Sequence, residues 1–334
     1  MKNKIDPYTI QKILFVSLSN IGDAILTTPS LDLVHRFFPK AEVTVMVGPR
    51  AREIFEHHPS MTRLILYDKH AGLKEKLKLI LQLKDECYDL VIDLKQTLLP
   101  FLIQPKFSTP LFRKKMDQHA ALRHLSYLKR IGIVGSCDFI LPDVEQYREK
   151  VDTLLVKNGV DVASKYVVIH PGAASFLKRW ELINFLKLAH ELREKNKIQV
   201  VIAGASSDQN EFEKVFPKKL WPNLVGELSL MELGALLTRA EFLIAHDSGP
   251  MHLAAALKTR VLAIFGPTDP KIYGPFGPSH RIVRLDLDCS PCMAPTCRIQ
   301  THDCLKKLEV EEVYRIANEI LSSPKCSKQC VFSQ

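Results

Sequence analysis

Short apolar runs alternate with longer segments of helical period along the first half of the chain. Four runs rich in apolar and β-branched residues predict strands at residues 12–18, 42–47, 63–67 and 88–93. Helical periodicity predicts helices between them, at residues 23–38 and 73–86. Strands that alternate with helices in this way are typical of a parallel sheet. The first half is therefore predicted to form one doubly wound α/β domain.

A second alternating series begins at residue 166. It predicts strands at residues 166–170, 198–203, 242–245 and 260–265, with helices near 180–194, 208–216, 229–239 and 250–257, and a final helix at 308–321. Residues 141–166 look like a helix followed by a polar connection, which places the domain junction at their end. Since the chain is too long for a single core, we expect an N-terminal domain of residues 1–165 and a C-terminal domain of residues 166–334.

The predicted fold class is α/β, with two Rossmann-like domains whose parallel sheets face a central cleft. Ligands of open α/β sheets bind outside the carboxyl ends of the strands. Many functions share this frame, so the function has to be inferred from the residues that follow the strands.

Composition and charge narrow the class of protein. With 46% hydrophobic and 25% charged residues, the chain is typical of soluble globular proteins. The formal net charge of +9 favours anionic partners, and residues 106–130 hold seven Lys or Arg against one Asp. That segment is either an ordinary solvated helix face or a surface for an anion. The apolar stretches are too short for a signal peptide or a membrane span, so we expect a cytoplasmic protein.

Four of the eight cysteines lie close together, at Cys289, Cys292, Cys297 and Cys304. All-cysteine zinc sites use closely spaced pairs, and the first two of these cysteines have a typical spacing. The other spacings are less typical, and buried reduced thiols explain the cluster as well. We therefore expect no metal, with zinc at these four cysteines as the alternative.

The first candidate site follows the first predicted strand, at residues 19–29. Its single glycine, Gly22, does not make the glycine pattern of a dinucleotide-binding loop, which disfavours a nicotinamide enzyme. Asp23 opens a predicted helix there. It is either an ordinary helix cap or a carboxylate that accepts a proton from an attacking sugar hydroxyl.

The second candidate site follows the first strand of the C-terminal half, at residues 170–180. Small residues that include Ser175 permit a close approach of the backbone to a ligand, and Lys178 and Arg179 come next. Cations at a helix start oppose the helix dipole, so a purely decorative role is disfavoured. A leaving diphosphate develops negative charge, which Lys178 is suited to stabilise.

The third candidate site lies at residues 245–256, where a strand runs into a helix. Ser248 and Gly249 precede a proline, and free amides at a helix start bind anions. Taken singly, Asp247 is a helix cap and His252 a buried histidine, but together they favour a diphosphate loop. Asp208, after another strand, is either a ribose ligand or a cap.

Residues 19–31, 170–180, 245–256 and 265–270, together with the cysteine cluster, resemble the heptosyltransferases of glycosyltransferase family 9. The motifs occur in the family's order through nearly the whole chain, and the cysteine-rich tail is most similar to the heptosyltransferase II branch. The resemblance implies the GT-B architecture. It also implies an inverting, metal-independent transfer from ADP-heptose without a cofactor.

The resemblance assigns roles residue by residue. Asp23 matches the catalytic base and Lys178 the diphosphate-binding lysine, while the nucleotide-phosphate loop corresponds to Asp247, Ser248, Gly249 and His252. Met231 stands where the family has a ribose-binding glutamate, so Glu232 and Asp208 are the remaining candidates for that contact.

The implied acceptor is a phosphorylated lipid A–Kdo core at the inner leaflet. We expect acceptor contacts from Asn20, Gly22, Arg113, Lys114, Lys115 and Arg123. Basic side chains near an anionic membrane favour reversible docking, so the protein should be peripheral at the inner face of the inner membrane.

Three alternatives remain on the same fold: a transferase with another nucleotide sugar or acceptor, a nucleotide-sugar epimerase, and an inactive nucleotide-sugar-binding protein. A nucleic-acid partner is not expected, because no helix-turn-helix or zinc-finger pattern is present.

Overall fold

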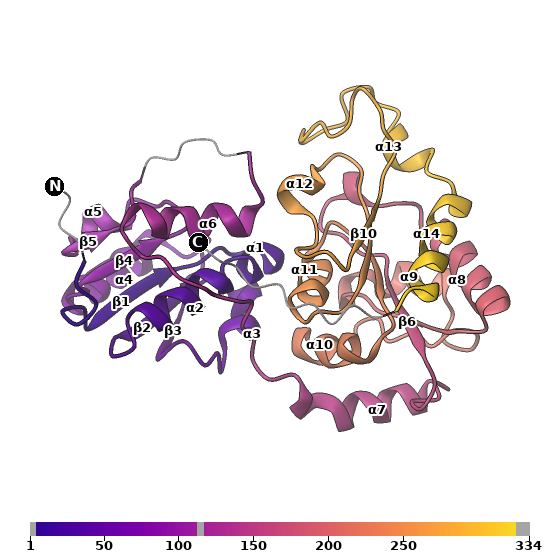
Figure 1. Cartoon of the computed structure of the whole chain (residues 1–334), viewed down its shortest axis with the longest axis horizontal. Coiled ribbons are helices and arrows are strands. Elements are labelled where there is room, and N and C mark those ends of the chain that lie inside the picture. The colour runs from indigo at the N-terminus through magenta and orange to yellow at the C-terminus, as the bar shows by residue number, and fades with distance from the viewer. Residues whose placement is uncertain (1–4, 112–116, 325–334) are drawn as a thin grey trace. The chain divides into compact units, whose positions relative to one another are not determined.

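The computed structural model describes residues 5–111 and 117–324. They form two compact units that divide between Pro142 and Asp143. The boundary thus lies earlier than the predicted junction at residue 165. The reason is that helix α7 (Arg148–Lys157) packs on helix α10 (Leu230–Arg239) of the second unit (Figure 1), where Asp152 accepts from Arg239.

The first unit is built on a five-stranded sheet in the order β3-β2-β1-β4-β5. Every pairing in it is parallel. The strands are β1 (Lys12–Val16), β2 (Glu42–Val47), β3 (Arg63–Leu66), β4 (Leu90–Asp93) and β5 (Phe107–Ser108). The structure confirms the four predicted strands. The sequence did not reveal β5, which has only two residues.

The helices of the first unit correct one prediction. A single helix was expected over residues 23–38, but α1 (Ile21–Ile25) and α2 (Thr28–Phe37) are separate. Pro29 lies in the first turn of α2, where its missing N–H costs nothing, whereas inside one continuous helix it would remove a hydrogen bond. The other helices are α3 (Arg52–Phe55), α4 (Leu73–Asp85), α5 (Leu99–Ile103) and α6 (Ala120–Arg130), with the short turn η1 (Pro49–Ala51).

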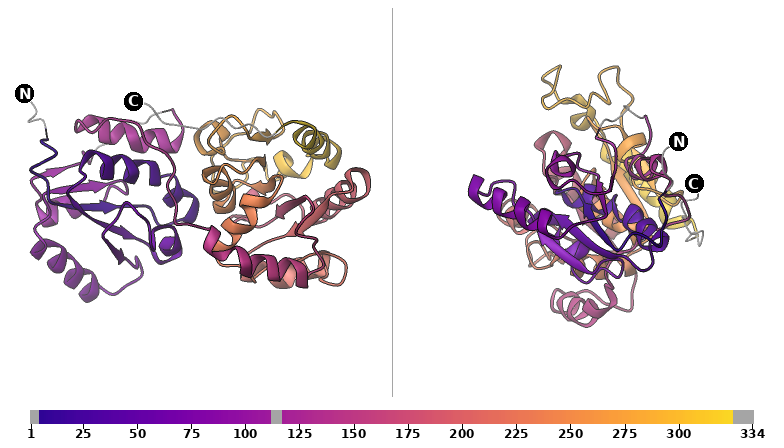
Figure 2. Two further views of the ribbon diagram at one scale, coloured as in Figure 1. Left: turned by 60° about the horizontal axis from the view of Figure 1, so that its bottom comes forward. Right: turned by 90° about the vertical axis from the view of Figure 1, so that its left-hand side faces the viewer.

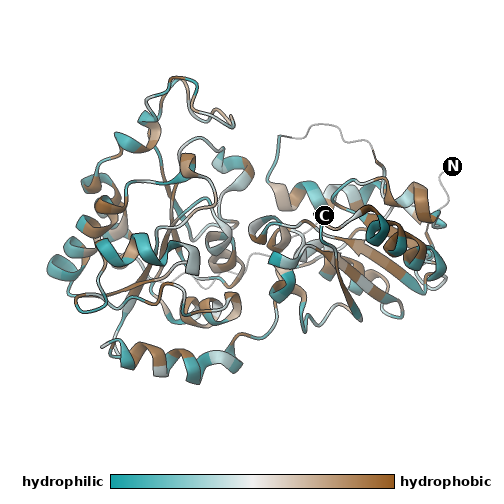
Figure 3. Cartoon of the chain, turned by 180° about the vertical axis from the view of Figure 1, so that it is seen from behind, coloured by the Kyte–Doolittle hydropathy of each residue, from teal (hydrophilic) through white to brown (hydrophobic). Residues whose placement is uncertain are grey.

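The second unit contains another parallel five-stranded sheet, in the order β10-β9-β8-β6-β7. Its strands are β6 (Tyr166–His170), β7 (Gln199–Ile202), β8 (Leu243–His246), β9 (Val261–Ile264) and β10 (Arg281–Val283). The strands of both units are largely hydrophobic (Figure 3), as expected when helices cover both faces of a parallel sheet.

Helices surround the second sheet (Figure 2). Besides α7 and α10 they are α8 (Leu182–Asn196), α9 (Gln209–Val215), α11 (Gly249–Ala256), α12 (Pro270–Tyr273), α13 (Asp303–Lys306) and α14 (Val310–Ser322), with turns η2 (Glu145–Tyr147), η3 (Phe176–Lys178) and η4 (Ser206–Asp208). The predicted final helix is confirmed as α14. Trp180 fixes the chain just before this helix, because its indole donates to the Leu308 carbonyl at 3.0 Å.

The strand orders place the loops that carry chemistry. In the first sheet the order reverses at β1, between β2 and β4, and in the second it reverses at β6, between β7 and β8. Ligands of such sheets bind at the carboxyl ends of the strands beside this reversal. The loops after β1, β4, β6 and β8 are therefore the candidate sites. Within the described ranges, no helix has both the length and the apolar character needed to cross a membrane.

Candidate functional site

Lys178 and Asp247 form an ion pair beside the strand reversal of the second sheet. The Lys178 ammonium lies 2.6 Å from one Asp247 carboxylate oxygen, and His252 Nε2 lies 3.9 Å from the other. Asp247 and His252 are buried, whereas the side chain of Lys178 remains 30% exposed. The structure thus brings together three residues predicted from separate positions in the sequence. The exposed ammonium is available to an anionic ligand.

Ser248 and Gly249 begin helix α11, next to this ion pair. Ser248 is the N-cap residue in extended conformation, but its hydroxyl donates to the His246 carbonyl at 3.2 Å and does not cap the helix. The first amides of a helix have no partner within the helix. The start of α11 therefore presents uncapped amides beside Lys178, an arrangement that suits a phosphate.

The loop after β6 requires glycine at position 172. A side chain there would place its Cβ 2.7 Å from an Asp208 carboxylate oxygen and 3.1 Å from His170 Cε1. Arg179 crosses the same loop, since its Nε donates to the Ala173 carbonyl at 2.9 Å and its Nη2 lies 3.4 Å from Asp208. Asp208 therefore stabilises this loop, which accounts for its burial without a ribose.

Ser175 precedes the short turn η3 that carries Lys178. Its carbonyl accepts from the Lys178 amide at 3.0 Å, which fixes the direction in which the lysine leaves the loop. Ser175 thus belongs to the same loop as Lys178, and its contact with the donor stays a prediction.

His246 supports the site from inside the core. Its Nε2 accepts from the Trp180 amide at 2.7 Å, directly after the Lys178–Arg179 pair. Burial lowers the pKa of His246 to about 3, with smaller contributions from His170 and Arg179. The ring is therefore neutral, which the acceptor role requires. The sequence did not indicate this contact, although His246 directly precedes Asp247.

Glu232 is engaged elsewhere. One of its oxygens accepts from the Ser229 amide at 2.8 Å in a capping box of α10, and the other accepts from Lys150. Burial opposes ionisation, but these donors hold the pKa of Glu232 below its ordinary value. Among the described residues, Glu232 forms no hydrogen bond or ion pair with Lys178 or Asp247. Its ribose role remains a proposal.

Asp23 is the third residue of helix α1, and Asn20 is the N-cap. The structure therefore rejects the interpretation of Asp23 as a cap. The Asn20 side-chain amide donates to an Asp23 carboxylate oxygen at 3.0 Å, and the carboxyl group is partly exposed. A carboxylate oriented by one donor and open to solvent can accept a proton.

A pocket of about 380 Å³ lies at the carboxyl ends of β1, β2 and β4, where Ser17 lines it; we call residues 17–20, between β1 and α1, the Asn20 loop. Its floor is apolar, and it is rimmed by Lys69, Lys76 and Lys95. Lys95 donates to the Ser19 hydroxyl at 3.1 Å and so joins the pocket to the loop that leads into α1, the helix of Asp23. Partial burial, aided by Lys69, lowers the pKa of Lys95. No sequence motif predicted this pocket, because its lysines come from three separate segments.

The basic segment, residues 106–130, falls partly outside the described residues. Arg113, Lys114 and Lys115 lie outside the described residues, so their predicted acceptor role is untested. Arg123 is a half-buried residue of α6, and Lys106 forms an ion pair with Asp89 at 2.7 Å. Gly22, which was predicted to contact the acceptor together with Asn20, lies in the first turn of α1 beside Asp23.

The four clustered cysteines line one small cavity of about 20 Å³ and form no disulfide. Burial raises the pKa of Cys304 to about 11, and the other three thiols add to this effect. Within residues 5–111 and 117–324, no group of three or more His, Cys, Asp or Glu side chains is arranged to hold a metal ion.

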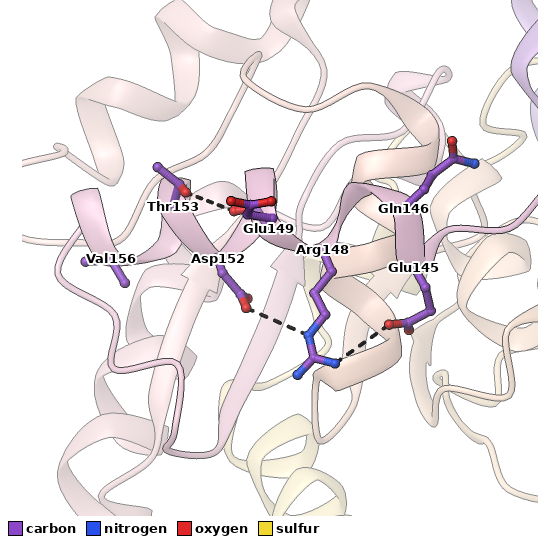
Figure 4. Close-up of a pocket in the computed structure, with 7 residues that line it drawn as sticks. All are labelled: Glu145, Gln146, Arg148, Glu149, Asp152, Thr153 and Val156. Atoms are coloured by element: carbon purple, nitrogen blue, oxygen red, sulfur yellow. Dashed lines mark hydrogen bonds and ion pairs between the residues drawn. The ribbon is translucent and has the colours of Figure 1, made fainter.

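A wide depression along η2 and α7 does not have the character of a site (Figure 4). Its side chains come from these two consecutive elements, and Arg148 lies between Glu145 and Asp152 at 3.9 Å from each. Because these side chains already pair with one another, they offer a ligand little.

Comparison with known proteins identifies the class. The architecture is that of the GT-B glycosyltransferases. It matches a glycosyl transferase family 9 structure from Veillonella parvula with a TM-score of 0.83 at 22% identity, covering 96% of this chain and 99% of that one. It also matches the E. coli ADP-heptose lps heptosyltransferase II with a TM-score of 0.73 at 21% identity, covering 93% and 98%.

The sequence identifies the family. The chain belongs to glycosyltransferase family 9 (heptosyltransferase), whose profile matches residues 113–302. It is 30% identical to lipopolysaccharide heptosyltransferase 3 of Escherichia coli K12, over 76% of this chain and 82% of that protein. It is 26% identical to lipooligosaccharide heptosyltransferase 2 of Campylobacter jejuni (serotype O:2), over 93% and 98%. The chain is therefore a glycosyltransferase, as its motifs predicted.

Proposed function

We propose that this enzyme transfers heptose from ADP-heptose to the phosphorylated lipid A–Kdo inner core of lipopolysaccharide. The relatives named above are heptosyltransferases of lipopolysaccharide or lipooligosaccharide, and one structural neighbour is an ADP-heptose enzyme. The observation that carries the proposal is the Lys178 ammonium held by Asp247 beside the uncapped start of α11. These groups suit the diphosphate of a nucleotide sugar.

The proposed reaction is a single displacement. The acceptor hydroxyl attacks the anomeric carbon of the heptose, the bond from that carbon to the diphosphate oxygen breaks, and ADP leaves with the electron pair. The proton of the attacking hydroxyl passes to the Asp23 carboxylate, which acts as general base. One displacement inverts the configuration at the anomeric carbon.

Charge stabilisation falls to the second unit. As ADP leaves, negative charge develops on its diphosphate, and a preorganised cation with helix amides stabilises that charge. We assign this role to Lys178 and to the amides of Ser248 and Gly249, with Asp247 and His252 orienting the lysine. In this scheme Lys178 takes the part that a divalent metal has in other transferases. Ser175, Asp208 and Glu232 remain proposed contacts of the nucleotide.

The first unit is proposed to bind the acceptor. The pocket behind the Asn20 loop combines an apolar floor with three lysines, none of which forms an ion pair among the described residues. A phosphorylated or carboxylated sugar matches that rim. The proposed location, at the inner face of the inner membrane, follows from a lipid-linked acceptor.

The test uses pure protein with ADP-heptose, other ADP-sugars and UDP-sugars, each with truncated lipopolysaccharide cores, and weighs the products by mass spectrometry. We expect an acceptor heavier by one heptose only with ADP-heptose. An isomerised free nucleotide sugar would instead indicate an epimerase, and no product with any pair would refute the proposed function.

A further inference from the structure

Helices α4 and α5 carry apolar side chains on the outside of the first unit. Leu73, Leu77 and Leu81 recur every four residues along α4 and are 74%, 52% and 61% exposed. Residues four apart lie on one side of a helix, so these leucines form a stripe. An exposed stripe of this length on a soluble surface calls for a partner.

The stripe continues onto the neighbouring helix. Leu98, Phe101 and Leu102, at the start of α5 and within it, are 65%, 62% and 48% exposed. The two helices pack together through Leu83, Leu99 and Ile103, which share one core cluster. We name the six exposed residues of α4 and α5 the leucine face. Both views in Figure 2 show α4 at the periphery of its unit.

The leucine face is bordered by lysines. Helix α4 carries four lysines against two acids, Glu75 and Asp85. Two further lysines belong to the nearby pocket. Among the described residues, none of these six lysines makes an ion pair: Lys74, Lys76, Lys78 and Lys84 of α4, and Lys69 and Lys95 of the pocket. Glu75 is used internally, since it accepts from the Gly72 amide at 3.1 Å.

We propose that the leucine face docks the enzyme on an anionic lipid bilayer. A helix with exposed leucines on one side and lysines beside them lies in the plane of a membrane interface, with its leucines among the acyl chains and its lysines at the anionic headgroups. A second copy of the chain is a poorer partner, because a symmetric contact through α4 would bring lysines against lysines. The occupant is therefore a lipid surface.

The inference rests on the proposed function and deepens it. A lipid-linked acceptor stays in the bilayer, so the enzyme must come to the bilayer to reach it. Leu98 and Leu102 belong both to the leucine face and to the lining of the lysine-rimmed pocket. Docking through this face would thus bring the pocket to the membrane. It moves the expected membrane contact from residues 106–130 to α4 and α5.

The test is sedimentation of the full chain with vesicles of phosphatidylethanolamine and phosphatidylglycerol, and with vesicles of phosphatidylcholine alone. We expect binding to the anionic vesicles, weakened by salt. The double variant Leu77→Gln/Leu81→Gln should lose it, while Lys74→Gln/Lys78→Gln should weaken it about fivefold for each lysine removed. Glutamine keeps the helix propensity of α4.

Matched controls come from the second unit. Ile183 and Leu220 are 46% and 67% exposed, and Lys187 and Lys214 are exposed lysines of helices. Glutamine substitutions at these positions should leave vesicle binding unchanged. Circular dichroism checks that each variant is folded.

Two results would overturn the docking proposal. One is that Leu77→Gln/Leu81→Gln still binds anionic vesicles. The other is that sedimentation velocity shows the loss of a dimer as the only effect of these substitutions. Failure of the proposed function gives a different pattern. Transfer to a deacylated, water-soluble acceptor should be the same in the α4 variants and the unmodified chain. If the unmodified chain lacks that transfer but binds vesicles through α4, docking stands and the proposed function falls.

Discussion

The Lys178 ammonium lies 2.6 Å from the Asp247 carboxylate, which is buried while the lysine is 30% exposed. The acid therefore fixes the position of the cation without removing it from solvent. A charge held in this way needs little reorganisation when a diphosphate arrives, and preorganised charge is what stabilises a leaving group most effectively.

Lys178→Met should weaken ADP binding on the order of 10- to 100-fold, because a hydrogen bond to a charged group contributes roughly 1.5–3 kcal/mol. Isothermal titration with ADP measures this change. Lys187→Met, on the exposed face of α8, serves as the control and should bind ADP normally. Equal ADP affinities in the two variants would show that Lys178 does not bind the diphosphate.

Lys95→Met should raise the KM for the acceptor on the order of tenfold and leave ADP affinity unchanged, since Lys95 rims the pocket of the first unit. The comparison variant is Lys106→Met, in the same unit, whose ammonium is already paired with Asp89. Steady-state kinetics with a soluble acceptor separates the two. A rise in the KM for ADP-heptose instead would show that this pocket is not an acceptor site.

Gly172→Ala should destabilise the second unit by roughly 1–3 kcal/mol, the usual cost of forcing an atom into a packed site. The added Cβ would meet the Asp208 carboxylate at 2.7 Å. Both tryptophans, Trp180 and Trp221, lie in the second unit, so their fluorescence during urea unfolding reports its stability. In the double variant with Asp208→Ala, the combined loss should be smaller than the sum of the single losses. Simple additivity would mean that the clash does not occur.

His246 makes the second unit sensitive to acid. Burial lowers the pKa of its ring from 6.5 to about 3. Between these two pH values the unfolded chain therefore binds a proton at His246 that the folded chain does not bind. Stability is therefore complete above pH 6.5 and falls as the pH drops toward 3. His246→Gln, whose side-chain oxygen can still accept from the Trp180 amide, should show a shallower loss of stability between pH 7 and pH 4. Unfolding followed by tryptophan fluorescence at several pH values checks this, and an unchanged slope would contradict it.

The sequence predicted the structure best where a regular apolar pattern is followed directly by residues with chemically reactive or charged side chains. Strands such as β2 and β6 have the predicted bounds because a buried parallel strand is a short apolar run. Lys178 was predicted in one candidate site and Asp247 with His252 in another, because each of the two segments follows a strand at the edge of a parallel sheet where ligands bind. The break at Pro29 was missed, since the apolar period continues across it.

Tertiary contacts were beyond the sequence. The pocket behind the Asn20 loop needs lysines from residues 69, 76 and 95, and nothing in their spacing links them. Likewise, the role of Asp208 in holding the loop at Gly172 depends on a packing distance. The boundary at Pro142 depends on the packing of α7 on α10. The sequence shows no sign of this packing, and the polar connection near residue 162 indicated a later boundary.

The general-base role of Asp23 is tested most directly by the single-turnover rate of heptose transfer in Asp23→Asn. Asparagine still accepts the hydrogen bond from Asn20, so α1 should be undisturbed and ADP affinity should match that of the unmodified enzyme. We expect a rate lower by on the order of 10²–10⁴-fold, the usual contribution of a general base. A rate close to that of the unmodified enzyme, with the same product, would show that Asp23 does not accept the proton.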